Sequence, residues 1–217
     1  MPRPRIWRVG KKLILDQQDY LKKIVTRFGL DDAESAITPL PERYEPEENK
    51  GTCTPEFQQQ YQSVIRSLLY VMLGTRPDIS YAVIKMAQFT SNPSSDHMNK
   101  AKQIICYFGS TPDLSLVFDG GSDKGSIAFC DSDWASDKIK RKPQTGYFFQ
   151  LAGASISWQS RAQKTIALSS TEAEYMALCD SCKQAKWIKT LFSELGINVG
   201  PVPVNGDNQG SIFLGSI

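Results

Sequence analysis

The spacing of apolar residues changes near Thr111-Pro112, and this change constrains the fold more than any other feature of the chain. Before it, apolar residues recur every three to four positions, which is typical of amphipathic helices. After it, short apolar runs alternate with turn residues, which indicates strands, until a helical pattern returns near Ser170. We therefore predict a mainly helical domain over residues 1–112 and an α/β domain over residues 113–217.

Stop signals divide the first domain into four helices. The predicted helices cover residues 16–28, 56–73, 79–90 and 95–108. Gly29 and Gly74 end the first two helices, and either Ser95 or Asp96 is expected to cap the fourth. Residues 38–55 lie between the first two helices and carry four prolines and mostly acidic side chains. They are predicted to form an extended, mobile linker.

The second domain is predicted to be a mixed sheet with helices. Its expected strands cover residues 114–118, 126–130, 146–151, 155–158 and 201–205. A long helix is expected from about Ser170 to Leu195, and a second one begins at Asp207-Asn208-Gln209. Strands followed by helix, strand and helix indicate the α/β class.

Three acidic residues lie where such a sheet would bring side chains together. Asp131 ends the strand Phe129-Cys130-Asp131, Asp207 follows the last strand, and Glu174 lies in the first turn of the long helix. At about 100° per residue, Glu174 heads the apolar stripe of this helix, whereas Glu172 lies about 160° away. The stripe continues through Leu178, Ser181, Ala185, Ile188, Phe192 and Leu195. We expect Glu174 to be buried and Glu172 to face water, in a capping box with Ser169.

Clustered carboxylates without basic partners repel one another unless a cation neutralises them. Oxygen ligands suit Mg²⁺ or Mn²⁺, and two such ions promote phosphodiester hydrolysis. Asp131, Glu174 and Asp207 are therefore the predicted metal-binding and catalytic residues. Each also has a structural alternative: Asp131 as a turn residue, Glu174 in a capping box with Thr171, and Asp207 as an N-cap.

Net charge is only +2, but basic residues are clustered. Lys138, Lys140, Arg141 and Lys142 form one cluster that can contact a phosphate backbone, although such runs are often only solvated. The pair Cys179-x-x-Cys182 has no second pair or histidine beside it, so packing is favoured over a zinc site.

The expected compartment is the cell interior, in the cytoplasm or the nucleus. The five cysteines are irregularly spaced, which fits reduced thiols better than a disulfide framework. The first residues contain no apolar run typical of a secretory signal. No segment has the roughly 20 apolar residues that a spanning helix needs, so no membrane partner is expected.

Several motifs together resemble the Pol polyprotein of copia-type LTR retrotransposons. The motifs Phe129-Cys-Asp-Ser-Asp-Trp-Ala135, Gly146-Tyr-Phe-Phe149, Ile156-Ser-Trp-Gln-Ser160, Ala167-Leu-Ser-Ser-Thr-Glu-Ala-Glu-Tyr-Met-Ala-Leu178 and Asp207-Asn-Gln209 resemble its ribonuclease H domain. Upstream, Leu15-Asp-Gln-Gln-Asp-Tyr-Leu21, Thr38-Pro-Leu40, Tyr61-Gln-Ser-Val-Ile-Arg-Ser-Leu-Leu-Tyr70 and Thr75-Arg-Pro-Asp-Ile-Ser-Tyr-Ala82 resemble the thumb-like end of its reverse transcriptase. Nearly the whole chain is covered.

The resemblance implies a ribonuclease H-like mixed sheet preceded by a helical thumb-like region. It makes Asp131, Glu174 and Asp207 the first three metal-binding acids, and an RNA–DNA hybrid and the rest of the polyprotein the partners. The family's polymerase motif, Tyr-x-Asp-Asp, does not occur here, so no polymerase activity is expected. Family members continue past Asp-Asn-Gln to a fourth acid, which implies a domain incomplete at its C-terminus. Two hypotheses therefore remain: a Mg²⁺- or Mn²⁺-dependent nuclease, or a non-catalytic remnant or domesticated protein that binds nucleic acid or a protein.

Overall fold

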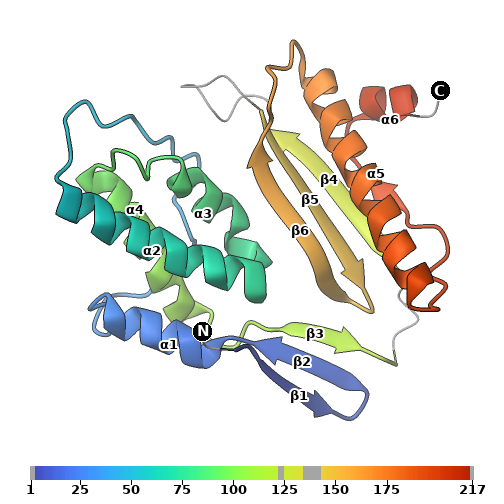
Figure 1. Ribbon diagram of the computed structural model, residues 1–217, viewed down its shortest axis with the longest axis horizontal. Coiled ribbons are helices and arrows are strands. Elements are labelled where there is room, and N and C mark those ends of the chain that lie inside the picture. The colour runs from blue at the N-terminus through green and yellow to red at the C-terminus, as the bar shows by residue number, and fades with distance from the viewer. Residues whose placement is uncertain (1–2, 122–124, 134–142, 216–217) are drawn as a thin grey trace. The chain divides into compact units, whose positions relative to one another are not determined.

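The chain folds into two compact units, Met1–Val117 and Phe118–Ile217, in a computed structural model that describes residues 3–121, 125–133 and 143–215 (Figure 1). The described elements combine α-helices with two sheets, which agrees with the predicted α/β class. Among the described helices, none is both long enough and apolar enough to cross a bilayer.

The first unit consists of a β-hairpin followed by helices. Its elements are β1 (Arg5–Val9), β2 (Lys12–Asp16), α1 (Gln18–Arg27), α2 (Pro55–Gly74), a 3₁₀ turn (Pro77–Ile79), α3 (Ser80–Ala87) and α4 (Ser95–Ser110). The hairpin pairs Arg5 with Asp16 and turns at Gly10, whose φ of +58° favours glycine. The four predicted helical segments are all present, although the third one begins as the 3₁₀ turn.

Helix α4 is capped one residue earlier than its sequence indicates. Ser94, rather than Ser95 or Asp96, is the N-cap: its hydroxyl accepts a hydrogen bond from the His97 backbone N–H at 3.2 Å. The Nδ1 of His97 accepts one in return from the Ser94 N–H at 3.0 Å. The imidazole is thereby held in a reciprocal capping box. Ser94 and Ser95 are adjacent serines, so the sequence pattern alone does not show which of them is the cap.

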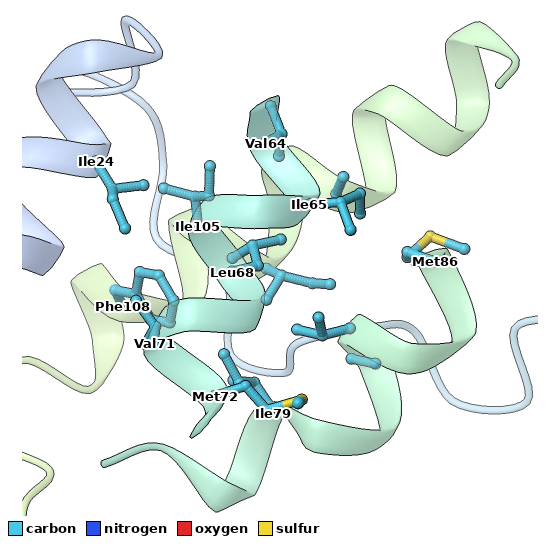
Figure 2. Close-up of a cluster of buried hydrophobic side chains, with 14 of the residues drawn as sticks. Ile24, Val64, Ile65, Leu68, Val71, Met72, Ile79, Met86, Ile105 and Phe108 are labelled. Atoms are coloured by element: carbon cyan, nitrogen blue, oxygen red, sulfur yellow. The ribbon is translucent and has the colours of Figure 1, made fainter. Parts of the chain in front are cut away.

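An apolar core holds α1 to α4 together (Figure 2). Leu68 lies near its centre and is fully buried. Tyr61 is also fully buried, and its hydroxyl donates a hydrogen bond to the Met86 carbonyl at 2.7 Å. The buried phenol is thus both packed and satisfied, as buried polar groups must be.

The segment 38–55 lies along this helical core rather than away from it. Tyr44 packs against the core and donates from its hydroxyl to Asp96 at 2.6 Å. Near the end of the segment, the Asn49 side chain donates to the Pro93 carbonyl at 2.9 Å. The prolines therefore set an extended path, and side chains attach that path to the helices.

Strand β3 (Leu116–Asp119) runs over the junction of the two units. It corresponds to the strand predicted at 114–118. It does not join the sheet of the α/β unit: the strand order of its sheet is β1-β2-β3. A pattern of alternating residues predicts a strand but not the neighbour with which it pairs.

In the described residues, the second unit is a four-stranded mixed sheet with two helices. Its elements are β4 (Ile127–Asp133), β5 (Gln144–Leu151), β6 (Ala154–Ala162), α5 (Ser170–Glu194), β7 (Val204–Asn205) and α6 (Gln209–Gly215). The strand order is β6-β5-β4-β7, antiparallel except for the parallel pair β4–β7. Ala152 and Gly153 both have positive φ in the β5–β6 turn, which suits a two-residue hairpin.

Helix α5 packs on β4 and β5 (Figure 1). The core beneath it is small and centres on Ala128, Phe149 and Ile188. The predicted helical stripe is correct at Glu174, Ser181 and Ile188, which are buried. It is wrong at Leu195, which is 64% exposed and lies just past the end of the helix at Glu194.

Candidate metal centre

Three carboxylates from separate elements meet at one edge of the second unit. They belong to Asp131 in β4, Glu174 in α5 and Asp207 in the turn between β7 and α6. One carboxylate oxygen of each lies within 4.8 Å of the corresponding oxygens of the other two. These are the three acids that the sequence singles out, and the structure brings all three together.

The open edge of β4 creates the space for this cluster. Strand β7 pairs only with Ala128 and Phe129. Beyond Phe129, no described strand covers that side of β4, where Asp131 lies. Asp207 follows the end of β7 by two residues, so the parallel pairing carries it toward the same edge. A short strand therefore places one carboxylate beside another without covering it.

The cap of α5 leaves Glu174 available to the cluster. The Ser169 hydroxyl accepts from the Glu172 N–H at 3.1 Å, and the Glu172 carboxylate accepts from the Leu168 N–H at 2.7 Å. Ser169 is thus the N-cap, as predicted, but the reciprocal bond of Glu172 goes to the Leu168 N–H and not to the Ser169 N–H of a strict capping box; Thr171 and Glu174 do not cap the helix. Glu174 is only 8% exposed, whereas Glu172 is exposed. Both orientations follow the helical stripe.

Asp207 is not the N-cap of α6. The Asn208 side chain has that role, because its Oδ1 accepts from the Ser211 N–H at 2.9 Å. The structural alternative for Asp207 is therefore wrong, and its exposed carboxylate remains available to the cluster.

Burial and like charge make Glu174 the electrostatically strained member of the cluster. Burial, together with the negative charges of Asp131 and Asp207, raises the pKa of Glu174 to about 7. The Ser132 backbone N–H, which donates to the Glu174 carboxylate, opposes that rise. No lysine, arginine or histidine in the described ranges forms an ion pair with any of the three. The cluster thus has the charge and the oxygen donors that suit a hard divalent cation.

Cys130 lies beside the cluster on β4. Burial and the charges of nearby acids, chiefly Glu174, raise the pKa of its thiol to about 11. Its Sγ lies 3.6 Å from the Asn205 carbonyl oxygen at the end of β7. A neutral thiol here fills space between the strands and adds no charge.

The other candidate sites of the sequence differ in outcome. Lys138, Lys140, Arg141 and Lys142 lie outside the described residues. All five cysteines are unpaired, and Cys182 is exposed rather than packed. In the described ranges, neither Cys179 nor Cys182 joins a group of three metal-ligating side chains. The sequence does not single out two residues that surround the acidic cluster. Ser132 donates its backbone N–H to Glu174, and the Gln163 side-chain amide lies between β4, β5 and α5.

Comparison with known proteins finds similarity to segments of transposon polyproteins. The retrovirus-related Pol polyprotein from transposon TNT 1-94 of Nicotiana tabacum is 37% identical over 214 residues, which are 95% of this chain and 16% of that protein. The retrovirus-related Pol polyprotein from transposon RE2 of Arabidopsis thaliana is 34% identical over 208 residues, covering 95% of this chain and 14% of that protein. The chain therefore spans about one-sixth or less of these polyproteins.

A shorter relative is similar to part of the chain. The secreted RxLR effector protein 161 of Plasmopara viticola is 39% identical over 128 residues, which are 59% of this chain and 90% of that protein. No protein-family model and no solved structure matches the chain.

Proposed function

Because this chain is similar to a segment of the retrovirus-related Pol polyproteins of transposons, we propose that it is a fragment derived from such a polyprotein and that its second unit is a ribonuclease H-type domain. Its substrate is the RNA strand of an RNA–DNA hybrid, and its reaction is phosphodiester hydrolysis that depends on Mg²⁺ or Mn²⁺. The first unit is then the thumb-like end of a reverse transcriptase. The setting is the cell interior, in cytoplasmic particles or the nucleus, together with the rest of the polyprotein.

The observation that carries this proposal is the convergence of Asp131, Glu174 and Asp207 within 4.8 Å. A cluster of like charges costs free energy in the folded chain unless a cation is bound there. Burial, and then the charges of Asp131 and Asp207, raise the pKa of Glu174, which agrees with such a cost. Perturbed carboxylates of this kind are characteristic of functional sites.

The exposed and the buried carboxylates have different roles in the proposed site. Asp131 and Asp207 are exposed and offer oxygens to both ion and solvent. Glu174 is largely buried and is oriented by the Ser132 N–H, so it fixes the inner side of the site. Divalent ions bound by such residues polarise the phosphodiester and activate water. The chain itself must supply a deprotonated Glu174, and no covalent intermediate with a side chain is involved.

The test is cleavage of a labelled RNA–DNA hybrid by the purified chain with Mg²⁺ or Mn²⁺. The wild-type chain should cut the RNA strand, and EDTA should stop cleavage. Asp131→Asn keeps the side-chain volume but removes a charged ligand, and it should abolish cleavage. Unchanged cleavage by this variant would refute the assignment.

A matched control is Glu172→Gln, which changes an acid of the same helix outside the cluster. Glutamine retains the acceptor for the Leu168 N–H, so the cap should survive and cleavage should continue. If the wild-type chain binds the hybrid with a steep salt dependence yet never cuts it, the non-catalytic nucleic-acid-binding function is favoured instead.

A further inference from the structure

We propose that Gln163 is a positioning residue that sets the spacing between Asp131 and Glu174, an inference that rests on the function proposed above. Gln163 follows β6, and its side chain enters the space beneath the first turns of α5. It is 5% exposed. Its backbone N–H donates to the Pro143 carbonyl at 2.8 Å, which anchors the residue beside β5.

The Gln163 amide joins three elements through one nitrogen. Nε2 lies 2.7 Å from the Thr145 hydroxyl in β5, 2.9 Å from the Ala173 carbonyl in α5 and 3.3 Å from the Ser132 hydroxyl in β4. The Ala173 carbonyl can only accept, so the amide must donate to it. Thr145 and Ser132 are both buried. The hydrogen bonds around the Gln163 amide are therefore shielded from solvent.

Each partner of this amide is next to the cluster. Ser132 follows Asp131 in β4, and Ala173 precedes Glu174 in α5. Thr145 precedes Gly146, which is the cross-strand partner of Asp131. Ser132 also donates its backbone N–H to the Glu174 carboxylate. One side chain thus fixes the strand that carries the first acid relative to the helix turn that carries the second.

The second hydrogen-bonding atom of the amide has a different environment. Gln163 Oε1 is buried and has no hydrogen-bond partner among the described residues. A buried acceptor without a partner costs stability. Glutamine is thus a poor choice here for stability alone. The position instead requires the donor group: the two N–H groups of Nε2 are shared among three acceptors, the shortest contacts being to the Thr145 hydroxyl and the Ala173 carbonyl, and all three acceptors belong to residues close to the acids.

Gln184 offers a matched comparison. Its Nε2 also joins α5 to the sheet, donating to the Ser157 hydroxyl in β6 at 3.1 Å. It lies ten residues after Glu174, roughly 15 Å along the helix. Gln184→Leu therefore removes a helix-to-sheet amide bond without touching the neighbours of the acids.

The experiment measures two quantities in the full chain carrying Gln163→Leu or Gln184→Leu: Mn²⁺ affinity by calorimetry, and hydrogen exchange of the Ser132 backbone amide by nuclear magnetic resonance. Gln163→Leu should weaken Mn²⁺ binding about tenfold, the usual scale for residues that orient metal ligands. It should also speed exchange at Ser132. In the hybrid assay it should lower kcat more than it changes KM. Gln184→Leu should leave all three unchanged.

The assignment is overturned if Gln163→Leu retains wild-type Mn²⁺ affinity and Ser132 protection, or if both variants change them equally. Thr145→Val repeats the test if Gln163→Leu does not fold, since it removes only the hydroxyl that accepts at 2.7 Å; an effect of about threefold is expected. If the wild-type chain binds no Mn²⁺, the proposed function fails. Ser132 exchange then decides the role of Gln163 by itself.

Discussion

The helical unit and the sheet unit differ in the size of their apolar cores. In the described ranges, eighteen buried apolar residues form one core in the first unit, whereas three form the core of the second. Both units also bury polar side chains, and in the second unit Ser132, Thr145, Gln163 and Glu174 are among them. Apolar burial dominates folding free energy, so the larger core gives the first unit the larger source of stability.

The contrast predicts that core truncation acts on the first unit alone. Leu68→Ala removes a fully buried side chain and should lower the free energy of unfolding by about 2–5 kcal/mol. Urea denaturation followed by circular dichroism measures this effect. Leu73→Ala is the control, because Leu73 lies on the same helix but is 68% exposed. A similar loss of unfolding free energy in both variants would contradict the core described above. A loss of Mn²⁺ affinity in folded Leu68→Ala would contradict the expectation that the truncation acts on the first unit alone.

Metal binding in the second unit should depend on pH. The pKa of Glu174 is about 7, and an ion requires the deprotonated carboxylate. Mn²⁺ affinity should therefore fall with the deprotonated fraction of Glu174, by about 50-fold between pH 7 and 5. Calorimetric titration across this range measures the effect. An affinity that stays constant between pH 5 and 8 would show that Glu174 does not bind the ion.

The same carboxylate should make the metal-free chain less stable as pH rises. Its pKa is about 7 in the folded chain against 4.5 for an unperturbed glutamate, so the folded state retains a proton that the unfolded state has lost. Stability from this group is complete below pH 4.5 and is lost as pH rises through 7. Glu174→Gln should therefore stabilise the metal-free chain by roughly 1–2 kcal/mol near pH 8, with the difference shrinking toward pH 4.5. Thermal melts in EDTA measure this difference in stability. If the charged carboxylate were stabilising, Glu174→Gln would melt at a lower temperature than the wild-type chain near pH 8.

The smallest expected effect tests a cap in the helical unit. Ser94→Ala removes the acceptor for the His97 N–H and should cost about 1 kcal/mol. Ser95→Ala changes the adjacent, exposed serine and should be nearly neutral. Denaturant midpoints of the two variants compare them directly, and a larger loss for Ser95→Ala would restore the cap that the sequence pattern favoured.

Periodicity predicted the features that depend on one element at a time. Helical spacing correctly predicted α1 to α5 and the burial of Glu174 against the sheet. It did not distinguish Ser94 from Ser95, because adjacent serines fit the same capping pattern. It also did not show which sheet β3 joins, since pairing is set by tertiary contacts. The sequence did not predict the role of Gln163 for a related reason. A single amide at the end of a strand carries no periodic signal, and its partners come from three distant segments.

Strand β7 consists of two residues, so few hydrogen bonds hold the backbone that carries Asp207. One of them comes from the Asn205 side chain, which donates to the Ala128 carbonyl at 3.0 Å. A cation bound by all three acids would cross-link this segment to β4 and α5. Loading the ion and docking the segment would then be a single cooperative event, and proteases would cut residues 198–208 more slowly in Mn²⁺ than in EDTA.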